Sequence, residues 1–175
     1  MIEGIDVIQK EIHENAVAHG WWESERSFGE ICALIHSELS EALEEYRKNQ
    51  PNVYWIAHKP EGIAVELADA VIRILDYMGR EGLRFDSLAE SAVSKDKAVF
   101  EDFGDFIARC HSDISDAYLR SGIEEDLIDR TAALSVCIAR IGAYFEANGL
   151  DLAEIIAVKH AYNKERPYRH GGKKI

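Results

Sequence analysis

The fold of this chain is decided by the stretch His36-Ser37-Glu38-Leu39-Ser40-Glu41-Ala42 and by its second copy, His111-Ser112-Asp113-Ile114-Ser115-Asp116-Ala117. In each copy two acidic residues stand three positions apart, a spacing that puts both side chains on one face of an α-helix. Apolar residues recur at helical intervals around them, and no stretch of the sequence shows sustained alternation of apolar and polar residues. The sequence therefore predicts an all-α fold.

The similarity between the two halves extends beyond these stretches. Chance repetition in one register is improbable, so we predict a helical bundle built by tandem duplication of a two-helix acidic unit. The repeats cover about 27–83 and 102–150 of a single domain, 1–175, and a basic segment, 151–175, follows them. The further matched positions are Phe28-Gly29-Glu30 with Phe103-Gly104-Asp105, Leu67 with Leu134, Arg73 with Arg140, Tyr77 with Tyr144, and Gly82-Leu83 with Gly149-Leu150.

Capping residues and helix breakers set the boundaries of the expected helices. Ser27-x-x-Glu30 reads as a capping box that opens one helix, and Pro60 suits the first turn of the next. Asp151 opens the last helix, which ends before Pro167. The expected helices cover about 4–18, 27–49, 60 to either 79 or 82, 87–94, 99–120, 124–147 and 151–166.

A second acidic motif, Glu66-x-x-Asp69, lies in the helix expected after Pro60. Apolar residues cover most of the circumference of this helix, so Glu66, Asp69, Arg73 and Asp76 form a narrow charged strip on a largely buried element. Burying such charges without partners costs several kcal/mol each, so the strip needs counter-charges or a metal ion.

Two helices with these motifs would bring four carboxylates together, those of Glu38, Glu41, Glu66 and Asp69. Four carboxylates at close range cannot all stay ionised without a cation, and Mg2+ is the simplest cation for an all-oxygen site, with Mn2+ as a substitute. In the second repeat, Ala133 and Val136 replace the second pair of acids, so we expect one working acidic site per chain.

Charge and composition restrict the partners of the protein. A net charge of −12 argues against general nucleic-acid binding, and no apolar run approaches the length of a membrane span. The first six residues lack the basic start of a signal peptide, and the three cysteines lack metal-binding spacing, so a cytoplasmic protein with reduced thiols is expected. Residues 159–175 carry six Lys or Arg against one acid, which suits a polyanion held between this segment and an acidic body.

These motifs carry a family resemblance. Glu38-x-x-Glu41 followed by Glu66-x-x-Asp69 resembles the metal motif of the MazG-like all-α nucleoside triphosphate pyrophosphohydrolases, and Lys159-x-x-Tyr162-Asn163-x-x-Arg166-Pro167 is similar to the segment that follows it in that superfamily. The resemblance implies Mg2+-dependent cleavage of a (deoxy)nucleoside triphosphate into monophosphate and pyrophosphate, a reaction suited to nucleotide-pool sanitation. Here the Lys/Asn segment follows only the second repeat, an arrangement similar to the dimeric dUTPase branch, and a homodimer is expected.

The resemblance also implies a role for each candidate residue. Glu38, Glu41, Glu66 and Asp69 would hold the ion, and a glutamate among Glu38, Glu41 and Glu45 would act as general base. Lys159, Asn163 and Arg166 would bind the triphosphate. Apart from the resemblance, His170 in the glycine-rich tail is a candidate for contact with a phosphate, and Trp22 is a candidate for stacking on the base. For the tryptophans Trp21 and Trp22, a packing role is an equally good interpretation.

Two alternatives remain open at the level of sequence. A catalytically silent helical protein would use the acidic strip for salt bridges, with Arg47 and Arg73 supplying part of them, and the basic tail for a partner. A di-iron carboxylate bundle would require Glu-x-x-His motifs in the candidate strips, and these strips contain none.

Overall fold

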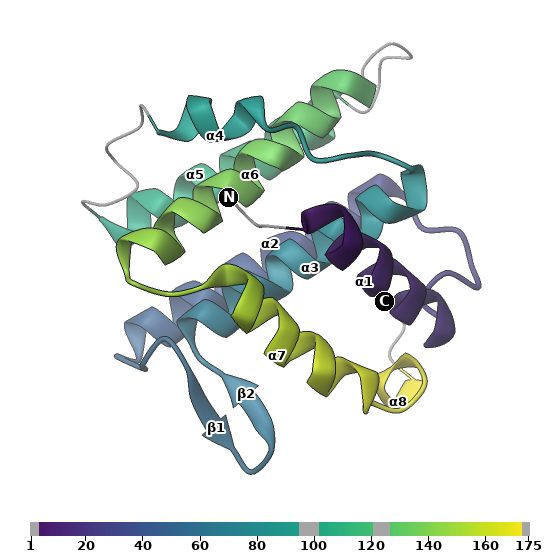
Figure 1. Ribbon diagram of the computed structural model, residues 1–175, viewed down its shortest axis with the longest axis horizontal. Helices are drawn as coiled ribbons and strands as arrows, with labels where there is room; N and C mark the ends of the chain where they lie inside the picture. The colour runs from purple at the N-terminus through teal and green to yellow at the C-terminus, as the bar shows by residue number, and fades with distance from the viewer. Residues whose placement is uncertain (1–3, 95–101, 121–126, 173–175) are drawn as a thin grey trace.

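The computed structural model describes residues 4–94, 102–120 and 127–172, and it is mostly helical, as the periodicity predicts. Four long helices, α2, α3, α5 and α6, pack as a bundle, while α1 and α7 lie against α3 and the short α4 lies against α6 (Figure 1). The elements are α1 (Ile5–Ala18), α2 (Phe28–Arg47), β1 (Tyr54–Ile56), β2 (Lys59–Glu61), α3 (Ile63–Glu81), α4 (Leu88–Val93), α5 (Phe103–Leu119), α6 (Leu127–Ala147), α7 (Leu152–Lys164) and α8 (Arg169–Gly172).

Local capping chemistry explains where several helices begin. At α2 the Ser27 hydroxyl accepts from the Glu30 amide at 3.1 Å, and the Glu30 carboxylate accepts from the Ser27 amide at 2.8 Å, which confirms the capping box. Asp102 caps α5 and Asp151 caps α7 without a reciprocal bond, each side chain accepting from two backbone amides. The expected starts of α5 at 99 and of α6 at 124 lie outside the described residues.

The prediction for Pro60 is wrong. Pro60 lies in β2, which pairs antiparallel with β1 in a two-stranded hairpin, and α3 begins only at Ile63. Gly62, with a φ of 119°, makes the sharp turn between them, and a Cβ atom there would lie 2.6 Å from the Pro51 carbonyl oxygen. The carbonyls of Pro51 and Asn52 in turn accept from the first amides of α3, so this turn fixes the start of the helix that carries Glu66.

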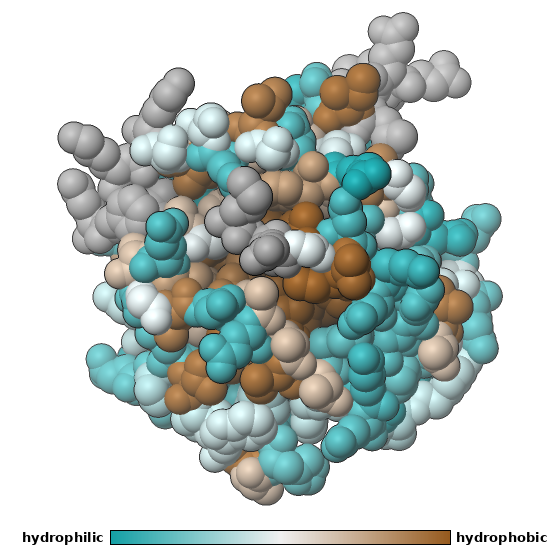
Figure 2. All heavy atoms as spheres, in the orientation of Figure 1, coloured by the Kyte–Doolittle hydropathy of each residue, from teal (hydrophilic) through white to brown (hydrophobic). Residues whose placement is uncertain are grey.

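The core is centred on α3, where most residues are buried, Glu66 of the charged strip among them, while Asp69, Arg73 and Asp76 are partly exposed. Its apolar side chains pack with inward-facing residues of the other long helices, including Ile35, Leu39, Ile114, Leu134, Ile138 and Ile141. All three cysteines are buried and free, as expected. Figure 2 shows hydrophobic side chains gathered near the centre of one face and hydrophilic ones around them.

Positions that the sequence alignment pairs make corresponding contacts in the two halves. Arg73 binds Glu38 between α3 and α2, and Arg140 binds Asp113 between α6 and α5. Rings pack in the same places, with Phe28 and Tyr77 in one half and Phe103 and Tyr144 in the other.

The paired histidines His36 and His111 meet where α2 contacts α5. Their Nδ1 atoms are 2.7 Å apart, and their rings are stacked with centroids 5.0 Å apart. Two residues that the sequence alignment pairs are therefore in direct contact.

The chain after α7 returns to the end of α1. The Arg169 amide and guanidinium donate to the carbonyls of His19 and Gly20, and α8 lies next to α1 in Figure 1. Within the described ranges, no helix combines the length and hydropathy that crossing a membrane requires.

Candidate functional site

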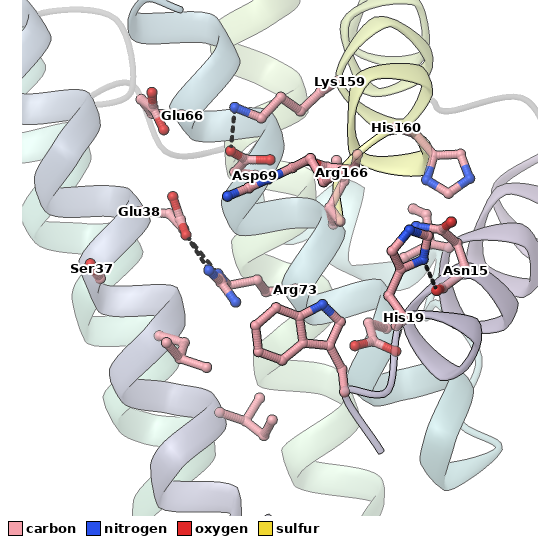
Figure 3. Close-up of a pocket in the computed structure, with 18 of the residues that line it drawn as sticks. Asn15, His19, Ser37, Glu38, Glu66, Asp69, Arg73, Lys159, His160 and Arg166 are labelled. Atoms are coloured by element: carbon pink, nitrogen blue, oxygen red, sulfur yellow. Dashed lines mark hydrogen bonds and ion pairs between the residues drawn. The ribbon is translucent and has the colours of Figure 1, made fainter. Parts of the chain in front are cut away.

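A pocket of about 280 Å³ opens between α1, α2, α3 and α7, beside the β-hairpin (Figure 3). It brings together side chains that are far apart in the sequence. Its polar and aromatic lining consists of Asn15, His19, Trp21, Arg26, Ser37, Glu38, Glu41, Lys59, Glu66, Asp69, Arg73, Asp76, Lys159, His160, Asn163 and Arg166.

Three carboxylates of this pocket lie close together. One oxygen from each of Glu38, Glu66 and Asp69 lies within 4.8 Å of the others, and no other group of this kind occurs in the part of the chain that the structure describes. Glu38 and its neighbour Leu39 are both buried in α2. Because α2 packs on α3, Glu38 lies next to the charged strip of α3. Glu66 lies in the first turn of α3, where the helix dipole favours a negative charge.

Two cations already contact these carboxylates. Arg73 binds the Glu38 carboxylate at 2.6–2.7 Å, and the Lys159 ammonium lies 2.7 Å from Asp69 Oδ2 (Figure 3). The Lys159 side chain is only 4% exposed, whereas that of Arg73 is 37% exposed. The acidic wall from α2 and α3 is therefore partly neutralised by α7 and by its own arginine.

Burial and mutual repulsion change the protonation of the wall. Burial, followed by the charge of Asp69, raises the pKa of Glu66 to about 8, and Lys159 only partly offsets this. Burial also raises the pKa of Glu38, against the lowering effect of Arg73. Burial alone would lower the pKa of Lys159, but the adjacent Asp69 and the other carboxylates outweigh it and raise the pKa, so this ammonium stays charged.

Two polar atoms of α7 lack hydrogen-bond partners in the pocket. His160 is 7% exposed and its Nε2 is unpartnered, and Asn163 Oδ1 is likewise buried without a donor. Burial, followed by the charge of Lys164, lowers the pKa of His160 and favours the neutral ring. An unsatisfied buried polar atom costs about 1–3 kcal/mol, so a ligand that hydrogen-bonds to both atoms would bind here favourably.

The predicted metal ligands do not all occupy the same place. Glu38, Glu66 and Asp69 converge, while Glu41 lines the same pocket one turn away as an exposed side chain that accepts from Ser37. Glu45 is not among the described residues that line the pocket. It accepts from the Tyr54 hydroxyl at 2.9 Å and so joins α2 to the hairpin.

Of the predicted substrate residues, Lys159, Asn163 and Arg166 all line the pocket from α7 and the residues just after it. Trp22 instead packs against the core and donates its indole N–H to Asp76 at 2.9 Å, and its neighbour Trp21 is the tryptophan that lines the pocket. The side chain of His170 lies outside the described residues.

Several lining residues were not found by sequence reasoning. The sequence does not reveal Lys59, because Pro60 predicts the start of a helix where the structure has a hairpin. His160 was missed although it adjoins Lys159 and stands three positions before Asn163, a spacing that puts it beside that residue on a helix. Arg26 and His19 carry no motif of their own, and only the path of the chain around α1 brings them here.

The equivalent region of the second half contains an ion pair. Arg140 donates to both oxygens of Asp113, at 2.8 and 3.2 Å, and both side chains are largely buried. Ala133 and Val136 stand where the first half has Glu66 and Asp69.

Comparisons of the chain with protein-family models, with curated proteins and with solved structures returned no significant match.

Proposed function

We propose that this protein is a divalent-cation-dependent nucleoside triphosphate pyrophosphohydrolase, which converts a (deoxy)nucleoside triphosphate to monophosphate and pyrophosphate. The observation that carries the proposal is the composition of one pocket. Three carboxylates from α2 and α3 face Lys159, Asn163 and Arg166 from the α7 side. A site with an acidic wall and a basic wall suits a polyphosphate bound together with a metal ion.

The carboxylates fit a hard divalent cation. All three donors are oxygens, and they lie within 4.8 Å of one another. At a metal–oxygen distance of about 2.1 Å, neighbouring octahedral ligands of Mg2+ are about 3.0 Å apart and opposite ones about 4.2 Å apart, so the side chains would have to close around the ion by roughly 1–2 Å. Bound there, Mg2+ or Mn2+ would neutralise the wall and polarise phosphoryl oxygens.

Residues of the chain would act as general base and bind the phosphate, sugar and base of the substrate. Glu41 lies in the pocket but outside the three-carboxylate cluster, so among Glu38, Glu41 and Glu45 it is the base that we favour for taking a proton from the attacking water. Arg166 offers a guanidinium that can make paired hydrogen bonds to phosphate. Asn163 and His160 supply neutral hydrogen-bonding groups for the sugar or base.

We further propose that the fold arose by duplication and belongs with the MazG-like superfamily. The matched ion pairs and the meeting of His36 with His111 support the duplication. The spacing of Glu38, Glu41, Glu66 and Asp69, followed by Lys159 and Asn163, supports the family.

The activity is tested with a panel of the common dNTPs and NTPs incubated with Mg2+ and assayed separately for pyrophosphate and orthophosphate. We expect pyrophosphate release from at least one nucleotide, dependent on the metal and abolished by Glu38→Gln. Release of orthophosphate alone, or no turnover of any nucleotide in Mg2+ or Mn2+, would show the proposal to be wrong.

One observation favours the alternative of a catalytically silent protein. The pairs Arg73–Glu38 and Lys159–Asp69 are the salt bridges that such a protein would keep. The unpartnered atoms of His160 and Asn163 weigh against it, because a purely structural site would gain stability by satisfying or replacing them. The wild type of a silent protein would bind no Mn2+ at this site.

A further inference from the structure

We propose that Lys159 and Arg73 are exchangeable counter-ions of the metal site. In the ligand-free protein they hold Asp69 and Glu38, and a divalent cation displaces them from these carboxylates and frees them to bind the polyphosphate. This inference rests on the function proposed above. It adds a role for Arg73 and makes cation binding the event that prepares the site for its anionic ligand.

Burial is the first reason for the assignment of Lys159. Its side chain is 4% exposed, and a buried ammonium requires an anionic partner. That partner is Asp69 Oδ2 at 2.7 Å. Because Asp69 also contributes an oxygen to the three-carboxylate cluster, a cation bound to this carboxylate competes with Lys159 for it.

Arg73 stands in the same relation to Glu38. Its guanidinium binds Glu38 Oε1 at 2.6–2.7 Å, and Glu38 is itself buried. The Arg73 side chain is 37% exposed and lines the pocket, so it can turn toward a ligand without leaving a charge buried.

The charges of the cluster show why the exchange matters. The three carboxylates and their two paired cations carry a formal charge of −1 when every carboxylate is ionised and of 0 when Glu66 holds a proton, and neither charge attracts a polyphosphate. A divalent cation changes the charge of the same group to +1 and at the same time releases two donors. Cation and polyphosphate then favour each other's binding, and by linkage the coupling is the same in both directions.

A second feature of the pocket indicates where the ligand would lie. His160 is 7% exposed, its Nε2 has no partner, and it adjoins Lys159 on α7. Asn163 Oδ1, one turn further along, is also unpartnered. His160 and Asn163 line the same pocket as Lys159, while in Figure 3 His160 points to the other side of α7, so a ligand that satisfies these atoms and contacts Lys159 would extend across the pocket.

The test measures Mn2+ binding without nucleotide, from the electron paramagnetic resonance signal of the free ion. We expect Lys159→Met and Arg73→Met each to bind Mn2+ about ten-fold more tightly than the wild type, since each removes a competing cation at hydrogen-bonding distance. Arg166→Met is the matched control, because Arg166 lines the same pocket but packs on the Tyr162 ring. It should change Mn2+ affinity by less than about two-fold, since its charge is not at a carboxylate of the cluster.

A second measurement follows inorganic tripolyphosphate by calorimetry at saturating Mn2+. Both variants should bind it at least about five-fold more weakly than the wild type, because the released donors are missing. Arg73→Met, at the more exposed side chain, gives an independent answer where Lys159→Met does not fold.

The possible outcomes are distinct. Unchanged or weaker Mn2+ binding by the folded variants, or an equal gain in Arg166→Met, would overturn the exchange and leave the proposed function standing. Absence of Mn2+ binding in the wild type and in every variant would overturn both.

Discussion

At the scale of the residue, the protonation of Glu66 connects the metal site to pH. Burial and the adjacent Asp69 raise its pKa to about 8, above its ordinary value of 4.5. A metal ion needs the ionised carboxylate, so binding must release a proton at neutral pH.

We therefore predict that affinity for Mg2+ or Mn2+ rises as the pH increases from 6 to about 8 and then levels off, because the pKa of Glu66 is about 8. Without metal, the effect of rising pH on the free energy of unfolding is opposite, because the protein becomes less stable. The unfolded chain ionises Glu66 first, so the contribution of this group to stability is complete below pH 4.5 and is lost as the pH rises through about 8.

Calorimetric unfolding in EDTA between pH 5 and 8.5 would measure that loss. Glu66→Gln, which resembles the protonated side chain, should abolish metal binding and flatten the dependence of Tm on pH. Glu41→Gln, at an exposed carboxylate of the same pocket, is the control and should keep the wild-type dependence. If the Tm of the wild type and the Tm of Glu66→Gln changed by the same amount over this pH range, the assignment would be contradicted.

Single residues also show what the sequence can and cannot reveal about the site. The spacing of Glu66 and Asp69 among apolar residues predicts two acids on a buried strip, and they are there. The pairing of Asp69 with Lys159 was not predicted, because it depends on how α7 crosses α3, and spacing within one helix carries no information about that crossing. Trp21 and Trp22 are likewise adjacent in the sequence, and only the path of the chain after α1 decides which one faces the pocket.

At the scale of the element, the approach of α1 to α3 depends on Gly79. A Cβ atom at Gly79 would lie 2.7 Å from the Cβ of His13, so the two helices meet closely at this point. Since α1 carries Asn15 into the pocket, the same contact positions one wall of the site.

Gly79→Ala should therefore destabilise the protein by about 1–3 kcal/mol through overpacking, although alanine is the better helix former. Gly142→Ala is the matched control. A Cβ at Gly142 in α6 would have its nearest neighbour at 3.9 Å, so we expect a gain of about 0.5–1 kcal/mol. Urea unfolding of both variants measures the difference, and equal stability of the two would show that α1 can move away from α3 without loss.

The contact of α2 with α5 gives a second prediction at this scale. Burial lowers the pKa of His36 and of His111, and in His111 the charge of His36 lowers it further. The unfolded chain then takes up protons first as the pH falls below the ordinary value of 6.5, so stability is present above 6.5 and is lost as the pH falls through that value toward the folded pKa.

Calorimetry between pH 7.5 and 5 should show a steeper fall of Tm in the wild type than in His111→Asn. The exposed His58 gives the control variant, His58→Asn, which should follow the wild type. Parallel curves for the wild type and His111→Asn would indicate that the pair takes up protons without cost to the interface.

Helix limits were predictable where a side chain encodes them. Ser27 with Glu30 and Asp151 mark starts that the structure confirms, because an N-cap is a local interaction. Pro60 gave a wrong prediction of a helix start, because its fixed φ suits a strand at the edge of a hairpin equally well. Strands of three residues are also too short to show alternation.

At the scale of the whole molecule, the two halves make the same kind of ion pair with different chemistry around it. In the first half the pair borders a cluster of carboxylates, and in the second half Asp113 and Arg140 are accompanied by Ala133 and Val136. We infer that the second pair stabilises the bundle and takes no part in binding a metal.

Asp113→Ala should accordingly lower stability by about 3 kcal/mol, since it leaves a largely buried guanidinium without this carboxylate, and leave Mn2+ affinity unchanged. Asp116→Ala, which removes only an exposed pair with Arg120, should cost less than about 1 kcal/mol. Chemical denaturation and metal titration on the same samples separate the two effects. Loss of Mn2+ binding in folded Asp113→Ala would show that the second half contributes to the site.

The crossing of α7 over α3 also has a consequence for synthesis. Lys159 is added ninety positions after Asp69, which at about 5–20 residues per second takes roughly 5–20 seconds. During that interval a nascent chain can bring α2 against α3 with the acidic wall complete and its lysine counter-ion still unmade. Free divalent cations in the surrounding solution are the species able to neutralise the wall at that stage, so the metal can assist the folding of the growing chain before any substrate is bound.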